Sequence, residues 1–227
     1  MRTNITIRAF PIDNFFRGLL GVCFFSRFPT ERSRVLRNRR RTIASAEIMI
    51  RAILFFLISL PSAPALAGFP SEIVQLLPPK GFEGPTSTDG PGGAHIEAYV
   101  HRISGTDRST LLQLTTYDFG SKLEGIPKKE LGNGAEHYLM QFLGGVERAR
   151  MNFHASKPTQ ITLGGSPGAR VDWTGEARGQ SMSGVMYCVI VGTVVVTFHT
   201  QSFEDSPPED RTAALHAIES VTFRTKN

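Results

Sequence analysis

The chain has 227 residues, 41% of them hydrophobic and 20% charged, and its formal net charge at neutral pH is +5. This charge is unevenly distributed, because residues 1–51 carry a net charge of +8 and residues 52–227 carry −3. The basic balance therefore belongs to the N-terminus, and it excludes a charge-based argument for nucleic acid as a partner of the folded part.

Residues 49–67 have the three parts of a secretory signal peptide. Met49 and Arg51 form a short positive region, residues 52–60 are apolar, and Ala65-Leu66-Ala67 is a small-x-small cleavage site. The apolar run is too short to span a bilayer. We therefore expect cleavage before Gly68 and a mature protein that is periplasmic or secreted, without stable membrane insertion.

Residues 1–48 are arginine-rich and precede this complete signal peptide. They are predicted to be a disordered extension, with Met49 as the favoured start of translation. The alternatives are a long positive region of the signal peptide or a twin-arginine signal at Arg40-Arg41.

The mature chain, residues 68–227, has the length of one domain with a core of its own. No cysteine lies directly after the cleavage site, so a lipid-anchored form is not expected. Cys188 is the only cysteine left after cleavage, so no internal disulfide can form. It lies among apolar strand residues, and we expect an inert buried thiol.

Periodicity changes along the first half of this domain. The pattern predicts a short strand within residues 68–79, a loop over Gly84–Gly93, and two paired strands over 94–103 and 111–119. From Ala135 the period is helical after an interruption at Gly132-Asn133-Gly134, with one apolar stripe at Leu139, Phe142, Leu143 and Val146. Further strands are predicted over 151–163 and 169–177.

The stretch Met182–Phe203 predicts a central hairpin. Its two arms are rich in β-branched and aromatic residues on both faces, which is typical of strands covered on both sides. Gly192-Thr193 fits a two-residue II′ turn, with glycine at the position that needs a positive φ. We expect Val189 and Val195 to be buried.

After the hairpin, Ser206-Pro207-Pro208-Glu209 predicts the start of a second helix, with Ser206 as the N-cap and Pro207 at the first helical position. An extended segment over residues 220–224 ends the domain. The pattern of strands and two amphipathic helices predicts an α+β fold, a mainly antiparallel sheet flanked by helices in an α/β/α sandwich.

Several segments resemble the PsbP-like superfamily. They are Leu77–Phe82 near the mature start, Leu163–Ala169 before a strand, the Tyr187–Thr200 hairpin, and Ala214–Phe223 at the end. The resemblance spans residues 73–224 and implies an antiparallel sheet between helical layers. Many small exported bacterial proteins of unknown role share this fold, so the resemblance implies no functional residues.

Two motifs resemble catalytic or metal sites. Gly164-x-Ser166-x-Gly168 matches a nucleophile elbow, but Pro167 and a following strand favour a tight turn. His95 and Glu97 would share a strand face as a two-ligand metal fragment. His101 lies too far along that strand to join them, and a solvated or helix-facing polar row is the favoured interpretation.

Arg170, Asp172, Thr174 and Glu176 form a polar row opposite Trp173, which is predicted to be core. Charge pairing explains the row, and a partner or ligand surface is its functional alternative. We predict no catalytic, cofactor-binding or metal-binding residues.

The sequence therefore predicts an exported binding or accessory module, not an enzyme, whose partner is an unidentified protein or small ligand of the cell envelope. The alternatives are a small-molecule or lipid carrier, or a metal-assisted enzyme using His95 and Glu97. An apolar cavity would favour a carrier, and a pocket with convergent ionisable groups would favour an enzyme.

Overall fold

A computed structural model describes residues 73–106 and 108–224 of the chain. Its main element is an eight-stranded antiparallel sheet with the order β2-β3-β4-β9-β8-β7-β5, in which β6 also pairs with β7. The strands are β2 (Glu83–Asp89), β3 (His95–Arg102), β4 (Ser109–Asp118), β5 (Met151–Ala155), β6 (Thr159–Leu163), β7 (Ser166–Ala177), β8 (Gln180–Val191) and β9 (Val194–Phe203). Two further strands, β1 (Val74–Gln75) and β10 (Thr222–Phe223), pair with each other.

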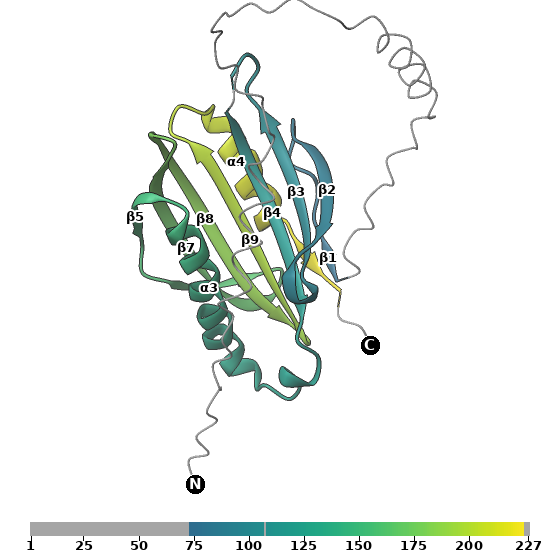
Figure 1. The fold of residues 1–227 in the computed structure, drawn as a ribbon. Coiled ribbons are helices and arrows are strands. Elements are labelled where there is room, and N and C mark those ends of the chain that lie inside the picture. Colours follow the sequence, from purple (N-terminus) through teal and green to yellow (C-terminus); the bar gives the residue numbers. More distant parts are fainter. Residues whose placement is uncertain (1–72, 107, 225–227) are drawn as a thin grey trace, which may run out of the picture. The chain divides into compact units, whose positions relative to one another are not determined.

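One α-helix covers each face of the sheet (Figure 1). Helix α3 (Leu131–Arg148) packs mainly on β7 and β8, whereas α4 (Pro208–Glu219) packs on β9 and β4. Short 3-10 turns occur at Pro91–Gly93, Gly120–Lys122 and Lys128–Glu130. The predicted α+β architecture, a mainly antiparallel sheet flanked by helices, is confirmed.

The predicted hairpin is β8 and β9, at the centre of the sheet. Val185, Tyr187 and Val189 pack in the core beneath α4, and Cys188 and Ile190 pack beneath α3. The two arms thus bury both faces, as their composition predicts. Val189 and Val195 are 0% and 1% exposed, and Gly192 has a φ of 61° at the turn.

Helix α3 begins at Leu131, so the predicted interruption by glycines is wrong. Gly132 and Gly134 are buried within its first turns. A Cβ on Gly134 would lie 2.9 Å from Ile190 Cδ1, and one on Gly132 would collide with the Gln160 side chain. The glycines therefore permit close helix-to-sheet packing, which offsets their low helix propensity.

The segment predicted as a loop over Gly84–Gly93 contains an edge strand, β2. Its side chains are mostly exposed and polar, so hydrophobic patterning gives no strand signal. Backbone pairing with β3 holds it instead, and Pro85 is tolerated because the strand lies at the edge.

Two other boundaries differ from the prediction. The single strand predicted over residues 151–163 is two strands, β5 and β6, which both pair with β7. Helix α4 begins one residue late, with Pro207 as its N-cap residue, and no side chain among the described residues caps it. The Ser206 hydroxyl is buried and meets no hydrogen-bond partner within residues 73–106 and 108–224, so the predicted serine cap is wrong.

The predicted signal peptide and N-terminal extension lie outside the described residues. Within the described ranges, no helix has the length and apolar character needed to cross a membrane.

Candidate ligand-binding cleft

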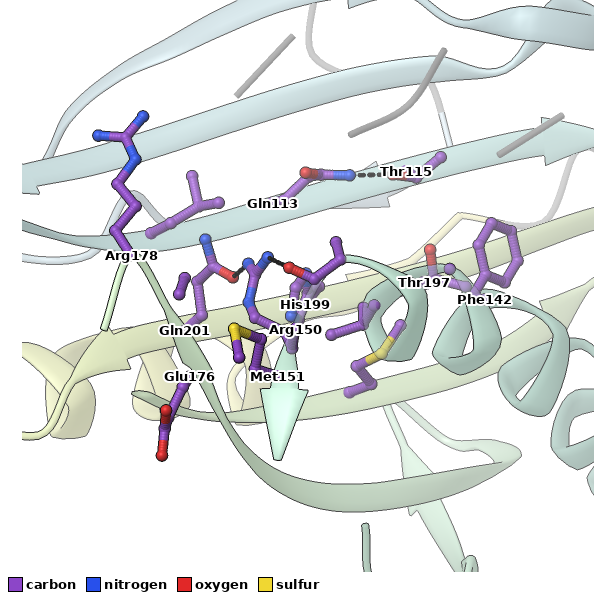
Figure 2. A pocket seen from close by; sticks show the side chains of 16 residues that line it. Gln113, Thr115, Phe142, Arg150, Met151, Glu176, Arg178, Thr197, His199 and Gln201 are labelled. Carbon is purple, nitrogen blue, oxygen red and sulfur yellow. Dashed lines mark hydrogen bonds between the residues drawn. The ribbon is translucent and has the colours of Figure 1, made fainter. Parts of the chain in front are cut away.

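A cleft of about 390 Å³ lies beside the second half of α3, on the α3 face of the sheet. Figure 2 shows its lining side chains, which come from the sheet strands, from α3 and from the segments that follow α3 and β7. Helix α3 packs mainly on β7 and β8, so it does not fully cover the neighbouring strands β4 and β9 on the same face. The cleft lies in this space beside the helix. The lining residues are Leu111, Gln113, Thr115, Phe142, Gly145, Val146, Ala149, Arg150, Met151, Glu176, Ala177, Arg178, Met186, Thr197, His199 and Gln201.

The floor of the cleft is a row of uncharged polar side chains. Gln113 and Thr115 on β4 lie directly opposite His199 and Thr197 on β9, and Gln201 follows along β9. Gln113 Nε2 donates a hydrogen bond to Thr115 Oγ1 over 3.0 Å (Figure 2). This row interrupts a face that is otherwise apolar, and it supplies donors and acceptors at the bottom of the cleft.

His199 is the most perturbed group of the row. Burial, together with the nearby positive charge of Arg150, lowers its pKa to about 3, so the imidazole is neutral at physiological pH. Its ring centroid lies 5.6 Å from that of Trp173. Its Nε2 atom is sealed from solvent and meets no hydrogen-bond partner within the described part of the chain. A buried polar atom that lacks a hydrogen-bond partner costs free energy.

Arg150 lies between the end of α3 and β5, at one side of the cleft. It donates to Gln201 Oε1 over 2.7 Å and to the carbonyl oxygen of Ala149 over 3.1 Å (Figure 2). Its guanidinium carbon lies 5.8 Å from the centre of the Trp173 ring. These contacts fix the orientation of a cation inside the cleft.

The wall formed by α3 is apolar, with Phe142 and Val146 facing Leu111 and Met186 of the sheet. Met151 lies at the mouth and is 69% exposed. Among the described lining residues Glu176 is the one carboxylate, and it accepts a hydrogen bond from Asn152 over 2.9 Å. The arrangement can bind a molecule that has both apolar and polar parts.

The structure separates the predicted row on β7. Arg170 and Asp172 form an ion pair of 3.0 Å on the α4 side, where the Arg170 guanidinium also lies 5.4 Å from the Tyr187 ring centre. Burial raises the pKa of the Tyr187 phenol. Thr174 is exposed, and Glu176 lines the α3 cleft instead. A partner surface formed by these four residues stays a prediction, whereas the core position of Trp173, which is 2% exposed, is confirmed.

His95 and Glu97 lie on β3 with 3.5 Å between Nε2 and Oε1, and Asp89 Oδ1 is 3.4 Å from His95 Nδ1. No group of three or more potential ligands is placed to hold a metal ion in residues 73–106 and 108–224. His101 lies against α4 rather than beside this pair. The Gly164-Gly165 segment is a tight turn between β6 and β7, with positive φ at both residues, as predicted.

The cleft was not predicted from the sequence. The sequence feature that could have indicated it is the alternation of polar residues at Thr197, His199 and Gln201 along a strand that is otherwise apolar. A second polar pair, Gln113 and Thr115, occurs on β4. Each pattern alone resembles a solvated strand end, and only the pairing of β4 with β9 brings the two together.

No protein-family model and no curated protein sequence matches the chain. Solved structures do match. One of them is a PsbP. This is the solution structure of cyanobacterial PsbP (CyanoP) from Synechocystis sp. PCC 6803, which is 12% identical with a TM-score of 0.45 and covers 69% of this chain and 96% of its own.

Two further structures are similar to this chain. LpqN of Mycobacterium tuberculosis, described as involved in cell envelope biogenesis, is 15% identical with a TM-score of 0.46, and the match covers 69% of this chain and 86% of LpqN. The protein of unknown function PA94 from Pseudomonas aeruginosa is 15% identical with a TM-score of 0.43, and the match covers 58% and 84% of the two chains. These likenesses concern the fold alone.

Proposed function

We propose that residues 68–227 form an exported, non-catalytic binding domain that takes up a small molecule in the cleft beside α3. The observation that supports this function is a cleft of about 390 Å³ with an apolar wall and a polar floor. Ligand pockets in proteins are concave, about 300–1,000 Å³ in volume, and mostly apolar with a few placed polar groups. The cleft favours a small ligand over a protein partner that needs only a flat surface.

The lining chemistry favours binding over catalysis. General acid–base catalysis needs a group whose pKa lies near the working pH, and His199 is held neutral far below it. Glu176, the single carboxylate among the described lining residues, is engaged by Asn152. The cleft is also not wholly apolar, so the ligand should carry polar groups that reach the floor.

Native mass spectrometry of the protein, produced from the full chain and isolated from the cell envelope, tests this function. We expect a co-purifying small molecule, because the apolar wall and the polar floor of the cleft can bury both parts of such a ligand. Ala149→Trp places a large ring at an exposed position that lines the cleft, and it should abolish this added mass. Ala155→Trp, at an exposed position on β5 outside the cleft, is the matched control.

Two results would contradict the proposal. One is that no added mass is found and that envelope extracts, added as a source of ligand, leave the Ala149→Trp and Ala155→Trp proteins with equal thermal stability. The other is a bound molecule that persists in the Ala149→Trp protein. The export component has its own test, because mass spectrometry of the exported protein should find the mature N-terminus near Gly68.

A further inference from the structure

The charged side chains of the cleft are engaged by other groups of the protein. Arg150 donates a hydrogen bond to Gln201 Oε1 over 2.7 Å. Glu176 accepts one from Asn152 over 2.9 Å, and Arg178 is not free either. A charged ligand that entered the cleft would have to compete with these contacts, because a charge that leaves water needs a partner of its own.

The Thr197 hydroxyl is an uncharged group of the floor that is open to a ligand. Thr197 on β9 lies directly opposite Thr115 on β4, and both residues line the cleft. Thr115 Oγ1 accepts a hydrogen bond from Gln113, whereas the Thr197 hydroxyl makes none within residues 73–106 and 108–224. Unlike His199 Nε2, it is not sealed from solvent. A hydroxyl both donates and accepts, so it suits an alcohol, an amide or another carbonyl group.

Gln201 supplies a second uncharged group on the same strand. Its Oε1 atom is bound by Arg150, and Figure 2 shows its Nε2 atom pointing away from that guanidinium. This amide nitrogen donates hydrogen bonds, and it too is not sealed from solvent. Thr197 and Gln201 are four residues apart on one face of β9, or about 13 Å along the strand. The floor therefore offers neutral hydrogen-bonding groups at two separate points.

The rest of the cleft suits an apolar body. Phe142 and Val146 form the α3 wall, and Leu111 and Met186 lie across from them on the sheet. Burial of each methylene group against such a wall contributes about 0.8 kcal/mol to transfer from water in general. Apolar contacts therefore supply most of the affinity, and neutral hydrogen bonds to the floor orient the ligand.

We infer that the cleft takes an uncharged amphipathic molecule, with hydroxyl, amide or other carbonyl groups bound by Thr197 and Gln201 and an apolar body lying along the α3 wall. This inference rests on the proposed function and names the chemical class of its ligand.

Three probes with an eight-carbon chain test the inference: octanamide, octanoate and octylammonium. Octanamide and octanoate have head groups of nearly the same size, so their comparison isolates the effect of charge. Their affinities for the full chain are measured by ligand-observed NMR at pH 7.5, where octanoate and octylammonium are both ionised. We expect octanamide to bind at least tenfold more tightly than either ion, because an ion leaves water without gaining a free partner of opposite charge.

Thr197→Val removes the floor hydroxyl and keeps the shape of the side chain. It should reduce octanamide affinity about three- to tenfold, the loss expected for one neutral hydrogen bond. Thr174→Val makes the same change at an exposed position on β7 outside the lining, and it should leave the affinity unchanged. Ala149→Trp should weaken the binding of octanamide by filling the cleft. If Thr197→Val does not fold, the comparison of the three probes on the unaltered protein still decides the matter.

Binding of octanoate or octylammonium as tight as that of octanamide would overturn the uncharged ligand and leave the small-molecule function standing. Equal affinities of the Thr197→Val and Thr174→Val proteins for octanamide would overturn the role of Thr197. Octanamide binding that persists in the Ala149→Trp protein would place the probe outside the cleft and overturn the inference. Failure of all three probes to bind at millimolar concentration would count against both the inference and the proposed function.

Discussion

The His101 imidazole on β3 lies against the Asp210 carboxylate on α4, with 2.7 Å between Nδ1 and Oδ2. Both atoms are buried, and within the described chain neither is in a hydrogen-bonding geometry with a partner. Asp210 is only 6% exposed, and it lies in the first turn of α4, whose dipole favours a negative charge. The pair therefore ties the outer half of the sheet to the helix that covers it.

Loss of this pair should loosen the attachment of α4. Asp210→Asn is expected to lower the free energy of unfolding by about 1–2 kcal/mol, because it removes a buried negative charge from the first turn of α4 and from beside His101. Chemical denaturation of the variant measures this change. His216→Gln, at an exposed position on the same helix, is the control and should stay within about 0.5 kcal/mol of the unaltered protein. Equal stability of Asp210→Asn and the unaltered protein would show that the pair is not stabilising.

His199 should make the fold sensitive to acid. Its pKa is lowered to about 3 in the folded state, whereas an unfolded histidine titrates near 6.5. The unfolded chain therefore binds the extra proton first, so stability is fully present above about pH 6.5 and falls as the pH drops towards 3. At pH 4.5 this residue alone should cost about 2–3 kcal/mol.

Denaturant unfolding at pH 7 and pH 4.5 checks this expectation against His199→Gln. The variant cannot take up the proton, so it should lose less stability between the two pH values than the unaltered protein does. The NMR signal of the His199 ring should also show no titration between pH 5 and 8. A midpoint near pH 6 would refute the neutral, buried state.

Two glycines on the α3 side should respond to alanine in opposite ways. Gly184 on β8 lies beneath the Trp173 ring, and a Cβ there would overlap that ring and the Thr200 carbonyl oxygen. Gly184→Ala is expected to destabilise the protein by about 1–3 kcal/mol through overpacking.

Gly144 on α3 is the matched comparison. A Cβ there would meet only Arg148 Nη1, at 3.8 Å, which is ordinary contact. Gly144→Ala should raise stability by about 0.5–1 kcal/mol, because alanine is the better helix former. Thermal unfolding of both variants measures the difference, and the same sign for both would show that Trp173 does not press on Gly184.

Cys188 should be unreactive in the folded protein. It is 0% exposed, and burial raises the pKa of its thiol, whereas the thiolate is the reactive form. In a Cys23→Ser full chain, a thiol reagent such as DTNB should label no cysteine until denaturant unfolds the domain. Rapid labelling under native conditions would contradict the buried position.

The central hairpin could be predicted from sequence because its residues carry both the strand signal and the burial signal. Valine favours the strand conformation and also favours burial, and Val189 and Val195 are both buried in strands. The local and the tertiary preferences of these residues therefore agree. The glycine at position 192 predicted the turn, because glycine readily adopts the positive φ that is found there. The two-sided cover by helices followed from the apolar character of both strand faces.

Other features depend on partners distant in the chain. Local sequence predicts that Gly134 breaks a helix, but in the structure its small size lets Ile190 lie against it. Local sequence likewise predicts a loop at β2, but backbone pairing with β3 makes it a strand. The cleft depends on where α3 lies across the sheet, which no local pattern of residues 131–148 contains. His199 and Gln113 are 86 positions apart, so their pairing is a property of the topology.

The two outer borders of the sheet have a shared consequence for assembly. On one side β5 and β6 pair in succession with the single long strand β7, so that border is broken midway. On the other side Pro85, which has no N–H group, lies within β2. An incoming extended chain would find no long unbroken ladder of donors and acceptors at either border. The broken border and the proline thus both oppose edge-to-edge polymerisation of the sheet.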